Sequence, residues 1–127
     1  MKILLDTSAF LWAITEDPRL KKSQRAAFAA EANDLFLSVA SVWEILIKTG
    51  LGKLAIPLPA APYIQRQMEQ NRIVSLGIQT RHLAELEKLP PLHRDPFDRM
   101  LVAQARAEGW PVMTGDREIG RYGVKIL

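Results

Sequence analysis

Four acidic residues of this chain follow apolar segments or open an expected helix, and carboxylates in such places are able to do chemistry. Asp6 ends the apolar run 3–5, and Asp116 follows the segment 112–115. Glu44 comes shortly after the run 35–39, and Asp98 lies at the start of an expected helix. Functional groups of open parallel sheets gather beyond the carboxyl ends of the strands. We therefore predict that these carboxylates converge at one edge of a sheet.

Converging carboxylates repel one another until a positive charge binds between them. Carboxylate, hydroxyl and water oxygens are hard ligands that suit Mg²⁺ or Mn²⁺. The chain carries 17 Lys and Arg against 14 Asp and Glu, a formal net charge of +3, which is compatible with nucleic-acid binding. Together these features indicate a divalent cation and phosphodiester chemistry.

Asp6 and Glu44 also have structural interpretations. Asp6 is a candidate N-cap, a role worth about 1 kcal/mol, although Ser8 could fill it as well. Ser41 and Glu44 have the spacing of a capping box, and Glu44 with Lys48 forms an i, i+4 ion pair. Taken alone, Glu44 would be assigned a structural role. Only its expected convergence with the other acids favours a functional role.

The acids later in the chain have a similar double interpretation. Asp95 is placed as an N-cap before Pro96 at the first helical position, with Asp98 two residues further into the helix. Asp98 is the better candidate ligand, because capping already explains Asp95. Whether Asp95 is only a cap or also a ligand stays open. Asp116 either caps a helical turn at 117–120 or takes part in the site.

The composition restricts the class of protein. With 127 residues, 48% hydrophobic and 24% charged, the chain is expected to form one globular domain, residues 1–127. The absence of cysteine excludes disulfides and thiolate metal sites and is compatible with the cytoplasm. The first residues do not resemble a signal peptide, and no apolar stretch approaches the ~20 residues that span a bilayer. We expect no membrane association.

Apolar runs alternate with helical patterns along the chain, which favours a mainly parallel sheet covered by helices on both faces. Strands are expected at residues 3–5, 35–39, 73–76, 111–114 and, at an edge, 124–127. Helices are expected at residues 8–15, 21–32, 41–49, 61–71, 80–89 and 96–108. Gly50 is expected just beyond the third helix and Gly109 just beyond the last.

Four segments carry a resemblance to a known family: residues 4–8, 41–45, 95–103 and 112–116. With them in order, the chain resembles the PIN domain family over essentially its whole length, and within it the VapC-type ribonuclease toxins of type II toxin–antitoxin systems. Lys48 with residues 52–54 resembles a stretch of one PIN toxin subgroup. The ordered set is specific, whereas any one segment alone would be weak.

The resemblance implies a three-layer α/β/α sandwich and endoribonuclease activity that depends on Mg²⁺ or Mn²⁺. It also implies a homodimer neutralised by a small antitoxin protein. The positions that match the acidic set of the family are Asp6, Glu44, Asp98 and Asp116, with Asp95 as an extra acid of the subgroup. Ser8 and Thr114 fall where the family often places hydroxyls near the metal.

We expect Asp6 and Asp98 to bind the metal directly, and Glu44 and Asp116 to act through water or to orient the nucleophile. The residues expected to hold the RNA backbone are Lys48, Arg94, Arg99 and Arg117. Two alternatives remain: a non-catalytic PIN-like module that binds RNA or protein, and a receiver-like signalling domain. The apolar helical faces around Phe10, Trp12 and Phe28 either form a groove for a partner or pack in the core, and core packing is favoured.

Overall fold

A parallel four-stranded sheet forms the centre of the molecule in the computed structural model, which describes all 127 residues. The strand order is β3-β2-β1-β4, and every pairing is parallel. The strands are β1 (Lys2–Leu5), β2 (Asp34–Ser38), β3 (Ile73–Leu76) and β4 (Val112–Met113). The expected edge strand at 124–127 is reduced to one bridge, between Ile126 and Val112 of the two-residue strand β4.

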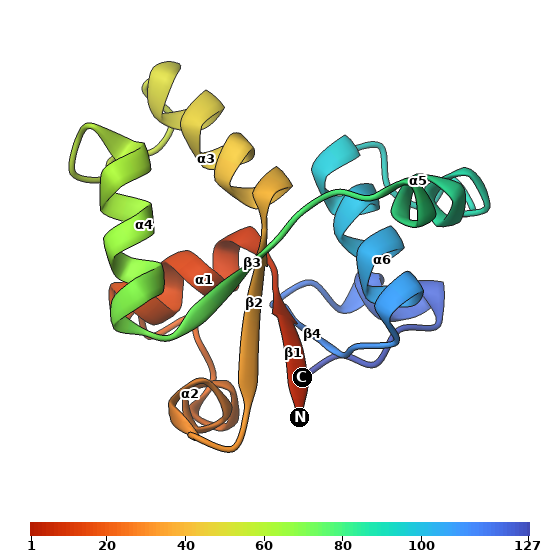
Figure 1. The fold of residues 1–127 in the computed structure, drawn as a ribbon, viewed down its shortest axis with the longest axis horizontal. Coiled ribbons are helices and arrows are strands. Elements are labelled where there is room, and N and C mark those ends of the chain that lie inside the picture. The colour runs from red at the N-terminus through yellow and green to blue at the C-terminus, as the bar shows by residue number, and fades with distance from the viewer.

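Helices cover both faces of the sheet, so the predicted three-layer α/β/α architecture is confirmed. The helices are α1 (Thr7–Ile14), α2 (Lys22–Ala29), α3 (Val39–Gly50), α4 (Ala60–Gln70), α5 (Thr80–Glu87) and α6 (Pro96–Glu108), followed by the 3-10 helix η1 (Arg117–Tyr122). Figure 1 shows α1 to α4 on one side of the strands and α5 and α6 on the other. None of the helices combines the length and the apolar character needed to cross a membrane.

Alternate residues of the central strand β1 belong to two separate cores. Ile3 and Leu5 pack in a cluster with Phe10 and with residues of α3 and α4. Leu4 points to the opposite face and packs in a second cluster with Val102 and other residues of α6. This follows from the two-residue period of a strand. The strand is therefore buried on both faces, and only its carboxyl end is free to carry polar side chains into a site.

Helix α3 begins earlier than its sequence suggests. Ser38 is its N-cap, and the Ser38 side chain accepts a hydrogen bond from the N–H of Ala40 at 3.1 Å. The interpretation of Ser41 and Glu44 as a capping box is therefore wrong, because both lie inside the helix. Strand β2 passes into α3 without a loop, since Ser38 is both the last strand residue and the cap.

The ends of three helices can be explained by local chemistry. Gly50 was expected just beyond α3 but is the last residue of that helix. Helix α2 ends at Ala29 instead of 32, because the side-chain amide of Asn33 donates to the carbonyl of Ala27 at 2.9 Å. Gly109 follows α6 as predicted and takes the left-handed conformation, with φ of 73°, that favours glycine.

A candidate acidic active site at the carboxyl edge of the sheet

Asp6 lies where the central strand β1 meets helix α1. Its backbone N–H donates to the carbonyl of Met113 at 3.0 Å, which joins the end of β1 to the end of β4. One carboxylate oxygen, Oδ1, accepts the N–H of Ala9 at 2.7 Å and caps α1. Asp6, and not Ser8, is therefore the cap.

Burial raises the pKa of Asp6 above its ordinary value. Hydrogen bonds from the Thr114 hydroxyl and the Ala9 amide lower it, while the charges of Glu44 and Asp116 raise it further. Those two carboxylates are close enough to repel Asp6 although they lie far from it in the sequence. The chain thus holds an acid whose charged form is destabilised and would be stabilised by a cation.

Glu44 is buried, with an exposed fraction of 7%, and connects two helices. Its Oε1 accepts a hydrogen bond from the hydroxyl of Thr7 in α1 at 2.6 Å, and its Oε2 accepts one from the ammonium of Lys48 at 2.6 Å. The i, i+4 ion pair with Lys48 predicted from the sequence is confirmed. The hydrogen bond to Glu44 raises the pKa of Lys48, as do the charges of the nearby Asp95 and Asp98. Lys48 therefore supplies positive charge within the acidic group.

Asp95 and Asp98 share the first turn of α6 but differ in their contacts. Asp95 is the N-cap, and its Oδ1 accepts the N–H groups of Phe97 at 2.8 Å and of Asp98 at 3.2 Å. The carboxylate of Asp98 is half-buried and accepts no hydrogen bond. Burial raises the pKa of Asp98 to about 6, with further contributions from the charges of Asp95 and Glu44.

Asp116 lies in the turn that follows β4. Its Oδ1 accepts the N–H of Glu118 at 2.9 Å and so caps η1, as the sequence suggested. Its own N–H donates to the Thr114 hydroxyl at 2.9 Å. Its Oδ2 lies 3.0 Å from Nε2 of His93, in the loop before α6.

The structure brings all five acids into one place. They line an open hollow of about 490 Å³, whose lining residues are Asp6, Ser8, Trp12, Glu44, Lys48, Asp95, Asp98, Gly115 and Asp116. Thr114 lies directly behind this set because its hydroxyl bonds to Asp6. The predicted convergence is confirmed as geometry, whereas the individual catalytic and ligand roles stay predictions.

The predicted RNA-binding cations are less uniform. Lys48 lines the hollow, while Arg94, Arg99 and Arg117 do not. Arg99 donates to the carbonyls of Pro90 at 3.0 Å and Leu89 at 3.5 Å, so its side chain holds the loop before α6. Any contact of these three arginines with RNA stays a prediction.

The residues of the hollow fit a divalent cation in their chemistry, because they offer carboxylate and hydroxyl oxygens. No three of these side chains stand close enough together to form a ligand set. The hydrogen bonds explain this, since the carboxylates of Asp6, Glu44 and Asp116 are each turned toward a protein donor. Mutual repulsion also keeps like charges apart.

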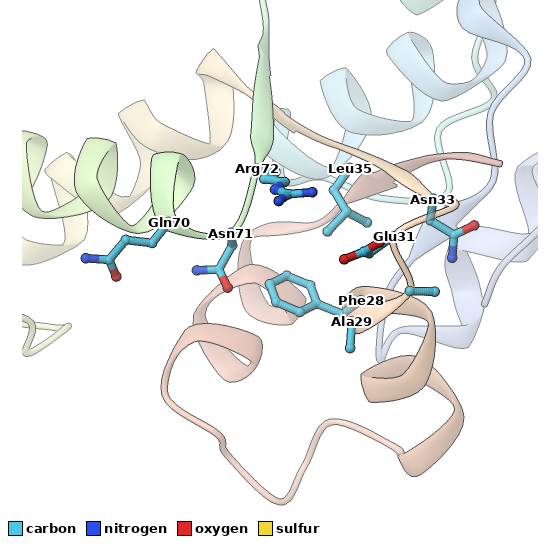
Figure 2. A pocket seen from close by; sticks show the side chains of 9 residues that line it. Phe28, Ala29, Glu31, Asn33, Leu35, Gln70, Asn71 and Arg72 are labelled. Atoms are coloured by element: carbon cyan, nitrogen blue, oxygen red, sulfur yellow. The ribbon is translucent and has the colours of Figure 1, made fainter.

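A second hollow, of about 330 Å³, lies away from the acids, between the end of α2 and the turn from α4 to β3. Figure 2 shows the ring of Phe28 within it, with Asn71 on one side and Glu31 on the other. Both of its asparagine amides already have partners, because Asn33 donates to Ala27 and Asn71 donates to Gln67, in each case closing a helix end. These groups terminate helices, and the acidic hollow remains the candidate site.

A model of the PIN domain family matches residues 3–125. This chain belongs to the PIN domain family. The PIN domain is also 30% identical over 119 residues to ribonuclease VapC22 of Mycobacterium tuberculosis (strain ATCC 25618 / H37Rv), which covers 92% of this chain and 88% of that relative. The resemblance seen in the sequence is thus confirmed, and family membership removes the receiver-like alternative.

Solved structures share the fold of this PIN domain. The structure of VapBC2 from Rickettsia felis bound to a DNA fragment from its promoter matches with a TM-score of 0.72 and 16% identity, covering 100% of this chain and 98% of that one. The structure of VapBC-1 from nontypeable Haemophilus influenzae also gives 0.72 and 16% identity, with 100% and 97% covered. At such identity the likeness shows the fold alone.

Proposed function

We propose that this PIN domain is a divalent-metal-dependent endoribonuclease and the toxin of a toxin–antitoxin pair. The observation that carries the proposal is the convergence of five carboxylates from four separate segments on one hollow at the carboxyl edge of the sheet. The relative named ribonuclease VapC22 supports the reaction class. The two similar solved structures are those of VapBC2 and VapBC-1, which supports an antitoxin partner.

The hydrogen bonds of the carboxylates support different roles within the site. Asp98 accepts no hydrogen bond, and Asp6 accepts from Ala9 and the Thr114 hydroxyl only, so both keep lone pairs for a metal ion. Both oxygens of Glu44 and of Asp116 already accept from protein donors. Asp6 and Asp98 are therefore the direct ligands, and Glu44 and Asp116 act through water.

A bound Mg²⁺ or Mn²⁺ lowers the pKa of a coordinated water and stabilises negative charge on the phosphate during in-line displacement. The protein residues position the reactants. Asp116 lies on the rim of the hollow, where its carboxylate orients the attacking water. Lys48 lies on the same hollow with its side chain half-exposed and contacts the RNA backbone in a sequence-independent manner.

The test compares Asp6→Asn and Asp98→Asn with the unmodified protein. Each substitution removes a charged ligand while keeping the size of the side chain, so RNA cleavage and thermal stabilisation by Mn²⁺ are both expected to be lost. Asp34→Asn is the matched control, because Asp34 is exposed at the opposite, amino end of β2. Unchanged cleavage in both site variants would refute the assigned roles. Binding of RNA without cleavage by the unmodified protein would favour the non-catalytic module.

We propose that the antitoxin covers an apolar hollow of about 510 Å³ between α3 and α4. Trp43 is 59% exposed on its wall, and Val39 and Leu46 of the same helix are also exposed. Exposed apolar surface of this kind marks interaction sites. The core packing favoured from the sequence is found for Phe10, which is fully buried. The homodimer implied by the resemblance also belongs to this proposal, and sedimentation of the purified protein tests it.

A further inference from the structure

Three residues form a hydrogen-bonded chain that leads into the acidic hollow. Nε2 of His93 lies 3.0 Å from Oδ2 of Asp116, and Nδ1 of the same ring lies 2.9 Å from the hydroxyl of Tyr122. The rings of His93 and Tyr122 are 5.4 Å apart between centroids. His93 comes from the loop before α6, whereas Asp116 and Tyr122 stand at the two ends of η1, so these hydrogen bonds join that loop to both ends of η1.

The chemistry of the groups sets the direction of these hydrogen bonds. An ionised carboxylate only accepts, so Nε2 of His93 carries the proton and donates it to Asp116. In the neutral ring, Nδ1 then accepts, and the Tyr122 hydroxyl donates to it. Tyr122 is 5% exposed and the His93 side chain 13%, so water has little access to compete for either bond.

These hydrogen bonds restrict the orientation of the Asp116 side chain. This side chain is 45% exposed and would otherwise sample several rotamers. Oδ1 is fixed by the N–H of Glu118 and Oδ2 by His93. With each oxygen held by a different donor, the plane of the carboxylate is defined, and the remaining lone pairs keep one direction relative to the hollow.

We propose that His93 and Tyr122 are positioning residues of the reaction, which orient the Asp116 carboxylate for its work at the rim of the hollow. The inference rests on the function proposed above and adds two residues that do not line the site. Such supporting hydrogen bonds around metal sites are typically worth about 10–100-fold in metal affinity or activity. A purely structural role would also join η1 to the loop before α6, so the test must separate the two.

The first comparison uses Tyr122→Phe and His93→Gln in the full chain. The Mn²⁺ concentration that gives half-maximal thermal stabilisation is expected to rise about tenfold in both, and kcat for RNA cleavage to fall about tenfold with KM changed less than about twofold. Tyr63→Phe is the matched control, because it removes the hydroxyl of the other tyrosine, on α4, where no hydrogen bond to that hydroxyl is found.

The second comparison is a double-mutant cycle with Asp116→Asn. If His93 acts through Asp116, adding His93→Gln to Asp116→Asn causes no further loss of kcat. Losses that multiply would overturn the inference, because they would show that His93 acts elsewhere. A structural role would instead lower thermal stability in both backgrounds.

Nuclear magnetic resonance of the imidazole nitrogens provides a measurement that needs no metal. In EDTA the proton of His93 is expected on Nε2, and a proton on Nδ1 alone would overturn the inference. If the unmodified protein neither binds Mn²⁺ nor cleaves RNA, the proposed function fails and the inference fails with it. If the unmodified protein does both and the two variants match Tyr63→Phe, the inference alone fails.

Discussion

Asp98 differs from the other acids of the hollow because no hydrogen bond reaches its carboxylate. Burial raises its pKa to about 6, and the charges of Asp95 and Glu44 add to this. The folded protein therefore binds a proton at Asp98 more tightly than the unfolded chain does. Between about pH 4 and 6, raising the pH ionises this group at a cost to the folded state, so its contribution to stability is present at low pH and is lost as the pH rises through about 6.

Asp98→Asn is expected to abolish cleavage and yet to stabilise the protein in EDTA at pH 7, by on the order of 1 kcal/mol after allowance for solvent screening. The amide removes a charge that burial and its neighbours disfavour. Thermal unfolding at pH 4, 5, 6 and 7 provides the measurement. The difference in stability between Asp98→Asn and the unmodified protein should grow across this range. A difference that stays constant with pH would contradict the raised pKa of Asp98.

The sequence predicted the candidate residues better than it predicted their partners. Asp6, Asp95 and Asp116 cap helices as expected, because the groups that they bind are two or three residues away. The contact of His93 with Tyr122 crosses 29 residues and depends on where η1 packs, so no local pattern indicates it. The hydroxyl of Thr7 was missed for the same reason, since Glu44 is 37 residues further along the chain.

At the scale of elements, helix α1 and the turn after β4 are in direct contact beside the site. A Cβ atom placed on Gly115 would lie 2.9 Å from Cζ3 of Trp12, which is too close for two carbon atoms. The Trp12 ring therefore packs against the backbone next to Asp116. Glycine is required here by this close approach and not by its backbone angles.

Gly115→Ala is expected to lower stability by about 1–3 kcal/mol, the usual cost of overpacking. Cleavage should fall as well, because either Trp12 or the Asp116 turn has to shift. Gly50→Ala is the control, since a Cβ there meets no atom within 4 Å and the backbone is helical. Thermal unfolding and a cleavage assay provide the measurements, and equal behaviour of the two variants would contradict the packing argument.

The elements themselves were predicted with errors at their ends. Alternating apolar runs and helical patterns predicted all six α-helices, because these patterns indicate which residues are buried against the sheet. The start of α3 was misplaced because Ser38 and Ser41 are equally good caps, and only the packing of β2 against its neighbours decides between them. The strand order was beyond the reach of the sequence, because it depends on contacts between distant segments.

For the molecule as a whole, the acidic hollow and the apolar hollow are distinct surfaces that share helix α3. Glu44 and Lys48 line the first, whereas Val39, Trp43 and Leu46 line the second. The helical period separates these two sets around one axis. A partner that covers the apolar hollow would therefore lie close to the acids, within reach of the site entrance.

Leu46→Asp is expected to leave RNA cleavage unchanged and to weaken binding of the cognate antitoxin about 100-fold, because it places a charge in an apolar interface. Leu83→Asp is the control, since Leu83 is also exposed but lies on α5, across the sheet. Calorimetric titration of each variant with the antitoxin gives the affinities. Equal affinities for the two variants would place the interface elsewhere.

The direct junction of β2 and α3 limits how the length of this chain can vary. Glu44 lies six positions after the cap Ser38, and each helical residue turns the side chain by about 100°. One residue inserted between Ser38 and Glu44 would rotate the Glu44 carboxylate away from the Thr7 hydroxyl. An apolar face of α3 would then take the position of the carboxylate. Insertions are tolerable instead in the segment 51–59, which connects α3 to α4. Among proteins of this lineage, the spacing from the end of β2 to this glutamate should thus stay fixed while the following loop changes in length.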